Sequence, residues 1–262
     1  MKKITLYALI GMLLLSFASC KTEKKANYYS DIYAEKPTTI YLAPIIDNSG
    51  RRIEKYPKDA AYNNEVNTAA KYLYQTMATP LIRHGYYVIG PVTSEQIASN
   101  DPRTPKQWRN AALTEYYTLY GIDAVLITTI HRWVESNATW TVYLEYQLRS
   151  AKTNVELMHK WVMASKIVPI DLKKDPHSLK TDVQFAKKMK FDDGTAQRCW
   201  LVEKVNDYVL RNIPISSTKR QFEDDLYKAA TDTYIKYTWS ATGNADVQSI
   251  SLEEYEQGCF IN

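Results

Sequence analysis

The segment that most restricts the fold is a run in which apolar and polar side chains alternate strictly. It reads TWTVYLEYQLRS, residues 139–150. One set of alternate positions is apolar: Trp140, Val142, Leu144, Tyr146 and Leu148. The positions between them point the other way: Thr141, Tyr143, Glu145, Gln147 and Arg149. A period of two is typical of a strand with one buried face, and we predict that the second face meets water.

A second strand follows this run after a short turn. Turn-forming residues occupy 151–154, and VELMHKWVMASKIV then continues to residue 168. Two β-rich runs joined by so short a turn predict an antiparallel hairpin.

The chain before the hairpin predicts a parallel β-α-β unit. A β-branched run, TTIYLAPI at Thr38–Ile45, ends at the turn-prone DNSG of Asp47–Gly50. Apolar residues then recur every three or four positions over Asn63–His84, which indicates an amphipathic helix that Gly85 ends. YYVIGP, Tyr86–Pro91, is the next strand, and a right-handed crossover would make the two strands parallel.

A second helical region and a buried strand complete this half of the chain. We predict helices over Ser94–Ala98 and Pro105–Tyr120, the latter ending at Gly121. IDAVLITTI, Ile122–Ile130, is apolar on both alternations, which predicts a strand inside the sheet with both faces covered.

The chain after the hairpin is less regular. A Lys-rich excursion at 169–193 predicts at most a short helix. Helices follow over Thr195–Arg211 and Thr218–Tyr237. The first of them carries one apolar stripe: Cys199, Val202, Val205 or Asn206, and Val209. The fold class predicted is α/β: a single, three-layer-like domain whose mixed sheet is flanked by helices.

The start of the chain resembles a bacterial lipoprotein signal. Lys2 and Lys3 precede an uncharged run that ends in FASC, with Cys20 after two small residues. This run is too short for an ordinary membrane span. FASC resembles the lipobox, although Phe17 replaces the usual aliphatic residue. We predict a signal peptide at 1–19 and an acylated Cys20; a plain signal peptide is the alternative.

The remaining boundaries follow from composition. Residues 20–37 are polar and predict a tether, 38–215 the α/β domain, and 216–262 a C-terminal helical extension. By resemblance to the retention rule of enteric bacteria, Lys21 predicts an outer-membrane lipoprotein that faces the periplasm.

Charge and cysteine content limit the function further. The chain has 33 basic and 29 acidic residues, and removing Lys2 and Lys3 leaves it near neutral. This balance does not favour nucleic-acid binding. Its 21 tyrosines and six tryptophans suit either an interface or a tyrosine-rich core. Cys199 and Cys259 could form a disulfide in an oxidising compartment, or Cys199 could be a buried thiol.

Four segments together resemble a known family. They are TTIYLAPIIDNSG after Pro37, LIRHGYYVIGP, YGIDAVLITTI and VYLEYQLRSAKTNVELMHKW. In this order they resemble bacterial lipoproteins of unknown function that include a neisserial surface-lipoprotein vaccine candidate. The resemblance covers Pro37–Ile213 and implies a fold similar to the TolB N-terminal domain and to CsgG-like envelope lipoproteins. It also implies partners of the CsgG-like or another envelope-lipoprotein kind, and it says nothing of the Lys-rich excursion or of the chain after Ser216.

A search for catalytic motifs finds none that points to an enzyme. G-x-S-x-G is absent, and no two histidines have the spacing of a helical metal site. The loop after the first strand lacks the glycines of a dinucleotide site, so Asp47, Asn48 and Ser49 form either a binding loop or a local turn. We therefore expect no cofactor, no metal and no catalytic residue.

These observations predict a non-enzymatic lipoprotein held to the membrane by Cys20. It would be an accessory subunit of a cell-envelope transport, secretion or assembly complex. A periplasmic ligand-binding or chaperone-like lipoprotein is the alternative, and a cryptic hydrolase is a third class. Neither the partner nor the oligomeric state follows from the sequence.

Overall fold

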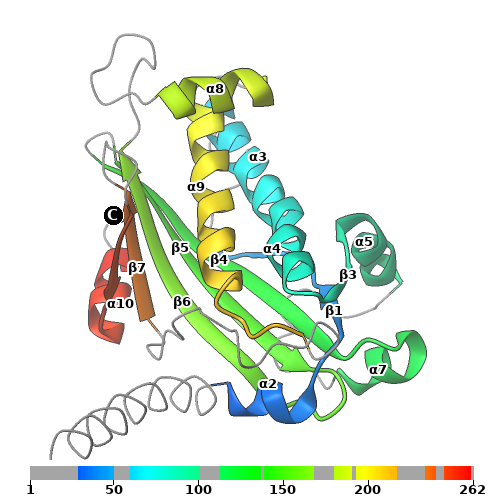
Figure 1. Ribbon diagram of the computed structural model, residues 1–262. Coiled ribbons are helices and arrows are strands. Elements are labelled where there is room, and N and C mark those ends of the chain that lie inside the picture. Colours follow the sequence, from blue (N-terminus) through cyan, green and yellow to red (C-terminus); the bar gives the residue numbers. More distant parts are fainter. Residues whose placement is uncertain are drawn as a thin grey trace, which may run out of the picture.

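The protein forms one mixed sheet that carries helices on both faces (Figure 1). The computed structural model describes residues 29–49, 60–100, 113–136, 139–167, 180–190, 193–216, 234–239 and 245–260. The strands in these ranges are β1 (Thr39–Leu42), β2 (Ile46–Asp47), β3 (Tyr87–Ile89), β4 (Ala124–Ser136), β5 (Thr139–Ser150), β6 (Glu156–Ile167), β7 (Tyr234–Trp239) and β8 (Ala245–Ser249). Their order is β3-β1-β4-β5-β6-β7-β8, and β2 pairs with β4.

Helices pack on both sides of this sheet. Those in the described ranges are α2 (Ser30–Glu35), α3 (Ala60–Thr76), α4 (Ala78–Arg83), α5 (Pro91–Ser99), α7 (Thr114–Tyr120), α8 (Lys180–Met189), α9 (Asp193–Leu210) and α10 (Leu252–Phe260). In Figure 1, α3 and α9 lie side by side on one face, and α10 lies across the sheet from them. No helix in the described ranges is both long and apolar enough to span a bilayer.

The strand pairings confirm the predicted mixed sheet. β1 is parallel to β3 and to β4, as a β-α-β start requires. β4, β5 and β6 are antiparallel neighbours, so the predicted hairpin is confirmed. The fold is therefore a single α/β domain.

We call the two sides of the sheet the helix-pair face and the α10 face. On β5, Val142, Leu144 and Tyr146 point to the helix-pair face, where they are fully buried under α3 and α9. The predicted stripe on α9 is also buried there, with Cys199 and Val202 fully inaccessible. Periodicity therefore identified this half of the core correctly.

A buried polar network ties the helix-pair face together. The Tyr146 hydroxyl donates to Oδ1 of Asn206 over 2.8 Å. Nδ2 of Asn206 donates in turn to the Leu73 carbonyl over 2.7 Å and to Oγ1 of Thr76 over 2.8 Å. Because α3 ends at Thr76, the Leu73 carbonyl lies in the last turn, where it has no backbone N–H partner in the helix and the Thr76 hydroxyl donates to it over 3.2 Å. Asn206 thus caps α3 from a neighbouring helix.

The predicted helix over Asn63–His84 is two helices rather than one. α3 ends at Thr76 and α4 begins at Ala78. Pro80 explains the break: it has no N–H to donate to the Thr76 carbonyl, and its ring would clash with that carbonyl in a continuous helix. Gly85 lies two residues after the end of α4 and has φ of 83°, as predicted for a glycine that ends a helix.

The predicted helix over Thr218–Tyr237 is wrong in its last part. Residues 234–239 form β7, which is parallel to β6, and β8 follows antiparallel to β7. Ile235, Tyr237 and Trp239 alternate as buried residues, which is the period of a strand. The predicted C-terminal helical extension therefore contributes two strands to the main sheet, and only α10 in its described part is helical.

The predicted tether also ends earlier than expected. Tyr29 and Ile32 are buried in the core, and α2 lies against the domain. The Glu35 carboxylate accepts hydrogen bonds from Ser150 and Thr153 in the β5–β6 turn. Residues 29–36 thus belong to the domain, while the predicted signal peptide and Cys20 lie outside the described residues.

Other predicted elements keep their type but change their bounds. β1 covers Thr39–Leu42, α5 extends the predicted short helix to Pro91–Ser99, and β4 extends its predicted strand to Ser136. α7 ends at Gly121, which has φ of 63° and closes the helix as predicted. The first part of the helix predicted over Pro105–Tyr120 falls largely outside the described residues. In the described part of the Lys-rich excursion there is one short helix, α8.

Candidate functional site

The α10 face is not open to water as the alternation in β5 had predicted. Tyr143, Glu145 and Arg149 point to this face, and all three are buried. Alternation correctly separated the two sets of side chains. It could not reveal that α10, more than 100 residues further along the chain, covers part of the polar set: the Tyr255 hydroxyl of α10 donates to the Leu144 carbonyl.

A β-bulge brings a histidine to the centre of this face. Ile130 is paired with Leu144, and the next pair is Arg132 with Tyr143, so His131 is an extra residue in β4. Both Ile130 and Trp133 belong to the core on the helix-pair face. The two residues between them are therefore directed to the α10 face, which is the usual way in which a bulge re-aims a side chain.

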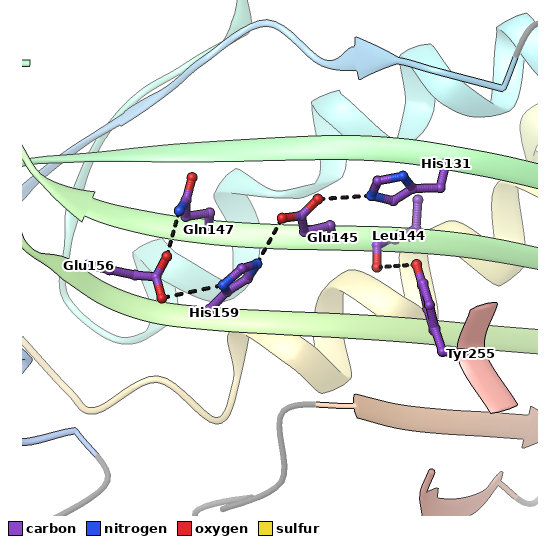
Figure 2. Close-up of polar contacts among 7 residues, drawn as sticks. All are labelled: His131, Leu144, Glu145, Gln147, Glu156, His159 and Tyr255. Atoms are coloured by element: carbon purple, nitrogen blue, oxygen red, sulfur yellow. Dashed lines mark hydrogen bonds and ion pairs between the residues drawn. The ribbon is translucent and has the colours of Figure 1, made fainter. Parts of the chain in front are cut away.

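Glu145 is the centre of a histidine–glutamate cluster made by three adjacent strands (Figure 2). Its side chain is 3% exposed. Its Oε2 lies 2.8 Å from Nε2 of His131, and its Oε1 lies 2.8 Å from Nε2 of His159. Nδ1 of His159 lies 3.3 Å from Oε1 of Glu156, and Gln147 donates to the other oxygen of Glu156. We call His131, Glu145, Gln147, Glu156 and His159 the histidine–glutamate cluster.

The contacts of His159 indicate its protonation state. A ring nitrogen that contacts a carboxylate oxygen must carry a hydrogen, because a carboxylate accepts and does not donate. Both nitrogens of His159 contact carboxylates, so the imidazolium form satisfies both contacts. A positive charge here also balances the buried charge of Glu145, which would otherwise be costly.

Aromatic rings cover one side of the cluster. The Trp161 ring stacks on His131 with 5.1 Å between centroids and lies 5.2 Å from the centroid of His159. It also stacks on Tyr234 and meets Tyr255 of α10 edge to face. We call Tyr143, Trp161, Tyr234 and Tyr255 the aromatic cover.

The packing of α10 against the aromatic cover depends on a glycine. A Cβ at Gly258 would lie 2.8 Å from Cζ of Tyr143 and closer still to its hydroxyl. These distances are shorter than van der Waals contact, so a larger residue at this position must push α10 away from the sheet.

The chemistry open to the cluster follows from these contacts. A general base needs a ring nitrogen that can accept a proton. Both nitrogens of His159 and Nε2 of His131 contact carboxylate oxygens. In the described residues, no group of three or more His, Cys, Asp or Glu side chains is placed to hold a metal ion. The histidine side chains are still 22% and 26% exposed, so small polar molecules can reach the edge of the cluster.

The predicted loop site lies near the cluster but forms a local turn. Oδ1 of Asp47 accepts a hydrogen bond from the Ser49 backbone N–H over 2.8 Å. The Asn48 N–H donates to the carbonyl of Ile130, directly before the bulge. Asp47 and Asn48 are exposed. The turn alternative describes these contacts, and a binding role for the three residues stays a prediction.

The predicted disulfide links two helices that lie on different faces. Cys199 is buried on the helix-pair face. The side chain of Cys259 lies outside the described part of the chain, and its helix, α10, packs on the α10 face. Because the Cα atoms of a disulfide lie within about 7 Å of each other, this arrangement does not favour the bond. The disulfide stays a prediction.

Comparison with known proteins gives only local similarity in sequence. No protein-family model matches the chain. A stretch of 57 residues is 32% identical to glutamate–cysteine ligase from Clostridium acetobutylicum. The match covers 22% of this chain and 12% of that enzyme. The chain thus spans about an eighth of the length of this relative.

Solved structures with some similarity include a neisserial lipoprotein. Lipoprotein GNA1162 from Neisseria meningitidis is 22% identical over 49% of this chain and 79% of its own, with a TM-score of 0.34. The hypothetical protein CT253 from Chlamydia trachomatis is 12% identical over 66% and 96%, with a TM-score of 0.38. The LpoB C-terminal domain from Salmonella enterica is 8% identical over 49% and 82%, with a TM-score of 0.23. Similarity at this level transfers no function, and the resemblance to TolB and CsgG stays a prediction.

Proposed function

We propose that this chain is a lipid-anchored, non-enzymatic accessory subunit of a cell-envelope complex, with acyl chains on Cys20. The observation that carries the proposal is FASC, which follows two lysines and an uncharged run. Acylation with more than one chain gives stable attachment, whereas a single chain gives only marginal membrane binding.

The contacts within the histidine–glutamate cluster suit a structural role, which agrees with the non-enzymatic part of the proposal. Glu145 contacts a histidine with each of its oxygens, and His159 contacts a carboxylate with each of its nitrogens. Hydrogen bonds to charged groups are stronger than those between neutral groups. These contacts link β4, β5 and β6, so the cluster holds three strands in register.

The location and partners of the chain are part of the same proposal. Lys21 after the acylated cysteine favours the outer membrane, with the domain in the periplasm. Partners would be CsgG-like or other envelope lipoproteins. The outer strands β3 and β8 end the described sheet on its two sides, and such strands can pair with another chain.

The anchor is tested by labelling cells with palmitate and separating membranes from soluble protein. We expect the protein to sediment with the envelope and to carry the label, and we expect Cys20→Ser to lose both. Cys259→Ser is the matched control and should retain both. Label and sedimentation that persist in Cys20→Ser would contradict the proposal.

The accessory role is tested by crosslinking in living cells. A photoactivatable residue at Tyr87 on β3 or at Gln248 on β8 should give adducts with an envelope protein, identified by mass spectrometry. Recovery of this protein without any partner at both positions would count against the role. The anchor test would be unaffected by that result.

A second candidate, a periplasmic ligand-binding lipoprotein, is favoured by one observation. The side chains of His131 and His159 are partly exposed, so a polar ligand could form hydrogen bonds at the edge of the cluster. Native mass spectrometry of the purified full chain tests this candidate. A small molecule that is bound to the wild type and lost in Glu145→Gln would support it, and an unliganded wild type would not.

A further inference from the structure

The short helix α7 exposes most of its large apolar side chains. Only Tyr116 is buried, and its ring stacks on Tyr41. Tyr117, Leu119 and Tyr120 are exposed, with Leu119 at 69%. Single exposed apolar residues need no explanation, but a group of them indicates a contact surface.

The β5–β6 turn extends this group. Nζ of Lys152 lies 5.8 Å from the centre of the Tyr117 ring, and Val155 is exposed directly before β6. The Ala151 N–H donates to the carbonyl of Asp123, just after α7. The turn and the helix are therefore held together, and we call Tyr117, Leu119, Tyr120, Lys152 and Val155 the α7 surface.

The N-terminal part of the domain leaves the fold beside the α7 surface. Glu35 at the end of α2 binds Ser150 and Thr153 of the same turn. Figure 1 shows α2 and α7 at the same end of the long strands. Tyr29 is buried, so it marks the point at which the chain becomes fixed to the domain.

The length of chain before Tyr29 limits how far this end can lie from a bilayer. The nine peptide links from Cys20 to Tyr29 span about 30 Å when fully extended. The twelve residues of β5 extend about 40 Å away from the turn. An anchor on Cys20 therefore keeps the end with the α7 surface near the membrane, whereas the far end of the strands can lie well away from it.

We propose that the α7 surface rests on the lipid headgroups of the membrane that carries the anchor, an inference that rests on the proposed function. Tyrosine is enriched at this depth because its ring is apolar and its hydroxyl is polar. Leu119 enters the acyl boundary, and Lys152 lies close to lipid phosphates. A weak contact is sufficient here, because the tether keeps the local concentration of lipid high.

The test uses the full acylated chain in cells, with p-benzoylphenylalanine at residue 119. Illumination should give lipid adducts, detected by mass spectrometry on protein that also carries labelled palmitate. The matched control has the same residue at position 247, because Val247 is exposed on β8, several strands away from α7. It should give no lipid adduct.

The outcomes separate this inference from the anchor itself. The protein could carry palmitate and yet give only protein adducts, or none, at position 119. This result would contradict the contact between the α7 surface and lipid but not the anchor on Cys20. Protein without palmitate overturns the anchor and the docking together. As a second variant, Leu119→Glu with the photoactivatable residue at position 120 should keep its palmitate and lose lipid adducts about tenfold. An unchanged yield would contradict the proposal.

Discussion

The two faces of the sheet receive side chains from the same strand and hold them in different ways. From β5, Leu144 and Tyr146 enter an apolar layer under two long helices, where Asn206 accepts the hydrogen bond of the buried Tyr146 hydroxyl. Glu145 enters a charged cluster whose histidines are partly exposed, and a single short helix covers its side. We infer that the packing under α3 and α9 tolerates substitution less well than the histidine–glutamate cluster does.

Solvent access is the physical reason for this difference. When a buried polar group on the helix-pair face loses its partner, no water molecule can take the partner's place. The full cost of desolvating that group therefore remains. On the α10 face, water can reach the histidine rings and replace a lost partner. Substitutions on the two faces should therefore differ in magnitude, although both break hydrogen bonds.

The largest effect is expected for Asn206→Ala. The Tyr146 hydroxyl loses its acceptor, and an unsatisfied buried group costs about 1–3 kcal/mol. The Leu73 carbonyl loses one of two donors, because the Thr76 hydroxyl still donates to it. We expect the free energy of unfolding to fall by about 2–4 kcal/mol, measured by urea denaturation. Gln75→Ala, on the exposed side of α3, is the control and should change it by less than about 0.5 kcal/mol. A loss of less than about 1 kcal/mol for Asn206→Ala would contradict this description of the network.

Alkaline pH should weaken the helix-pair face next. Burial, and then the neighbouring Tyr208, raise the pKa of the Tyr237 hydroxyl from 10.0 to about 12. Because the folded state keeps this proton to higher pH, the stabilisation is fully present below about pH 10 and is lost between about pH 10 and 12. The loss is on the order of 2–3 kcal/mol.

Urea denaturation between pH 8 and 12 measures this effect. Tyr237→Phe should show a shallower fall in stability with pH than the wild type. Burial also raises the pKa of Tyr146, so some slope should remain in the variant. Tyr234 lies on the α10 side of the same strand, so Tyr234→Phe should change the pH dependence of stability less than Tyr237→Phe does. Equal slopes for wild type and Tyr237→Phe would show that the hydroxyl does not titrate as described.

On the α10 face, Glu145→Gln should have a moderate effect. The amide oxygen can accept from one histidine, but the amide N–H₂ group faces the other and the negative charge is lost. Since both histidines are partly exposed, we expect the free energy of unfolding to fall by about 1–2 kcal/mol. Glu253→Gln, an exposed acid of α10, is the control. A loss as large as that of Asn206→Ala would remove the distinction between the faces.

The smallest change in global stability is expected for Gly258→Ala. The added Cβ collides with Tyr143, so α10 moves away from the aromatic cover. Helix propensity offsets part of the cost, because alanine favours a helix by about 1 kcal/mol over glycine. We expect global stability to change by less than about 1 kcal/mol while the fluorescence of Trp161 becomes more accessible to iodide. Gln257→Ala, on the exposed side of the helix, should leave the quenching unchanged.

The sequence predicted the elements whose periodicity is set by the apolar core. The apolar stripe on α9 and the alternation of β5 both reflect burial on the helix-pair face, so both elements could be predicted from the sequence. Pro80 was also visible, and its missing N–H gives a reason for the break between α3 and α4 that the apolar spacing hides. The strand at Tyr234–Trp239 was missed because its period of two extends over only six residues, which follow directly on the longer predicted helix and overlap its end.

The histidine–glutamate cluster could not be predicted from the pattern of the hairpin. Arg149 pairs with Glu156, and continuing this register would place His159 beside Tyr146; an extra residue in β6 shifts the pairing, so His159 lies beside Gln147 instead. His131 also reaches this face through a bulge, and nothing in the sequence marks either irregularity. The aromatic cover depends on Tyr255, which is separated from Leu144 by 111 residues. Contacts over such distances leave no local pattern.

Hydrogen exchange of the full chain tests the contrast between the two faces most directly. We expect amides of α9 and of the central part of β5 to exchange only by global unfolding, so that their protection falls with urea as the free energy of unfolding does. Amides of α10 should exchange by local opening and be insensitive to low urea. Equal protection in α10 and α9 would show instead that the two faces unfold as one unit.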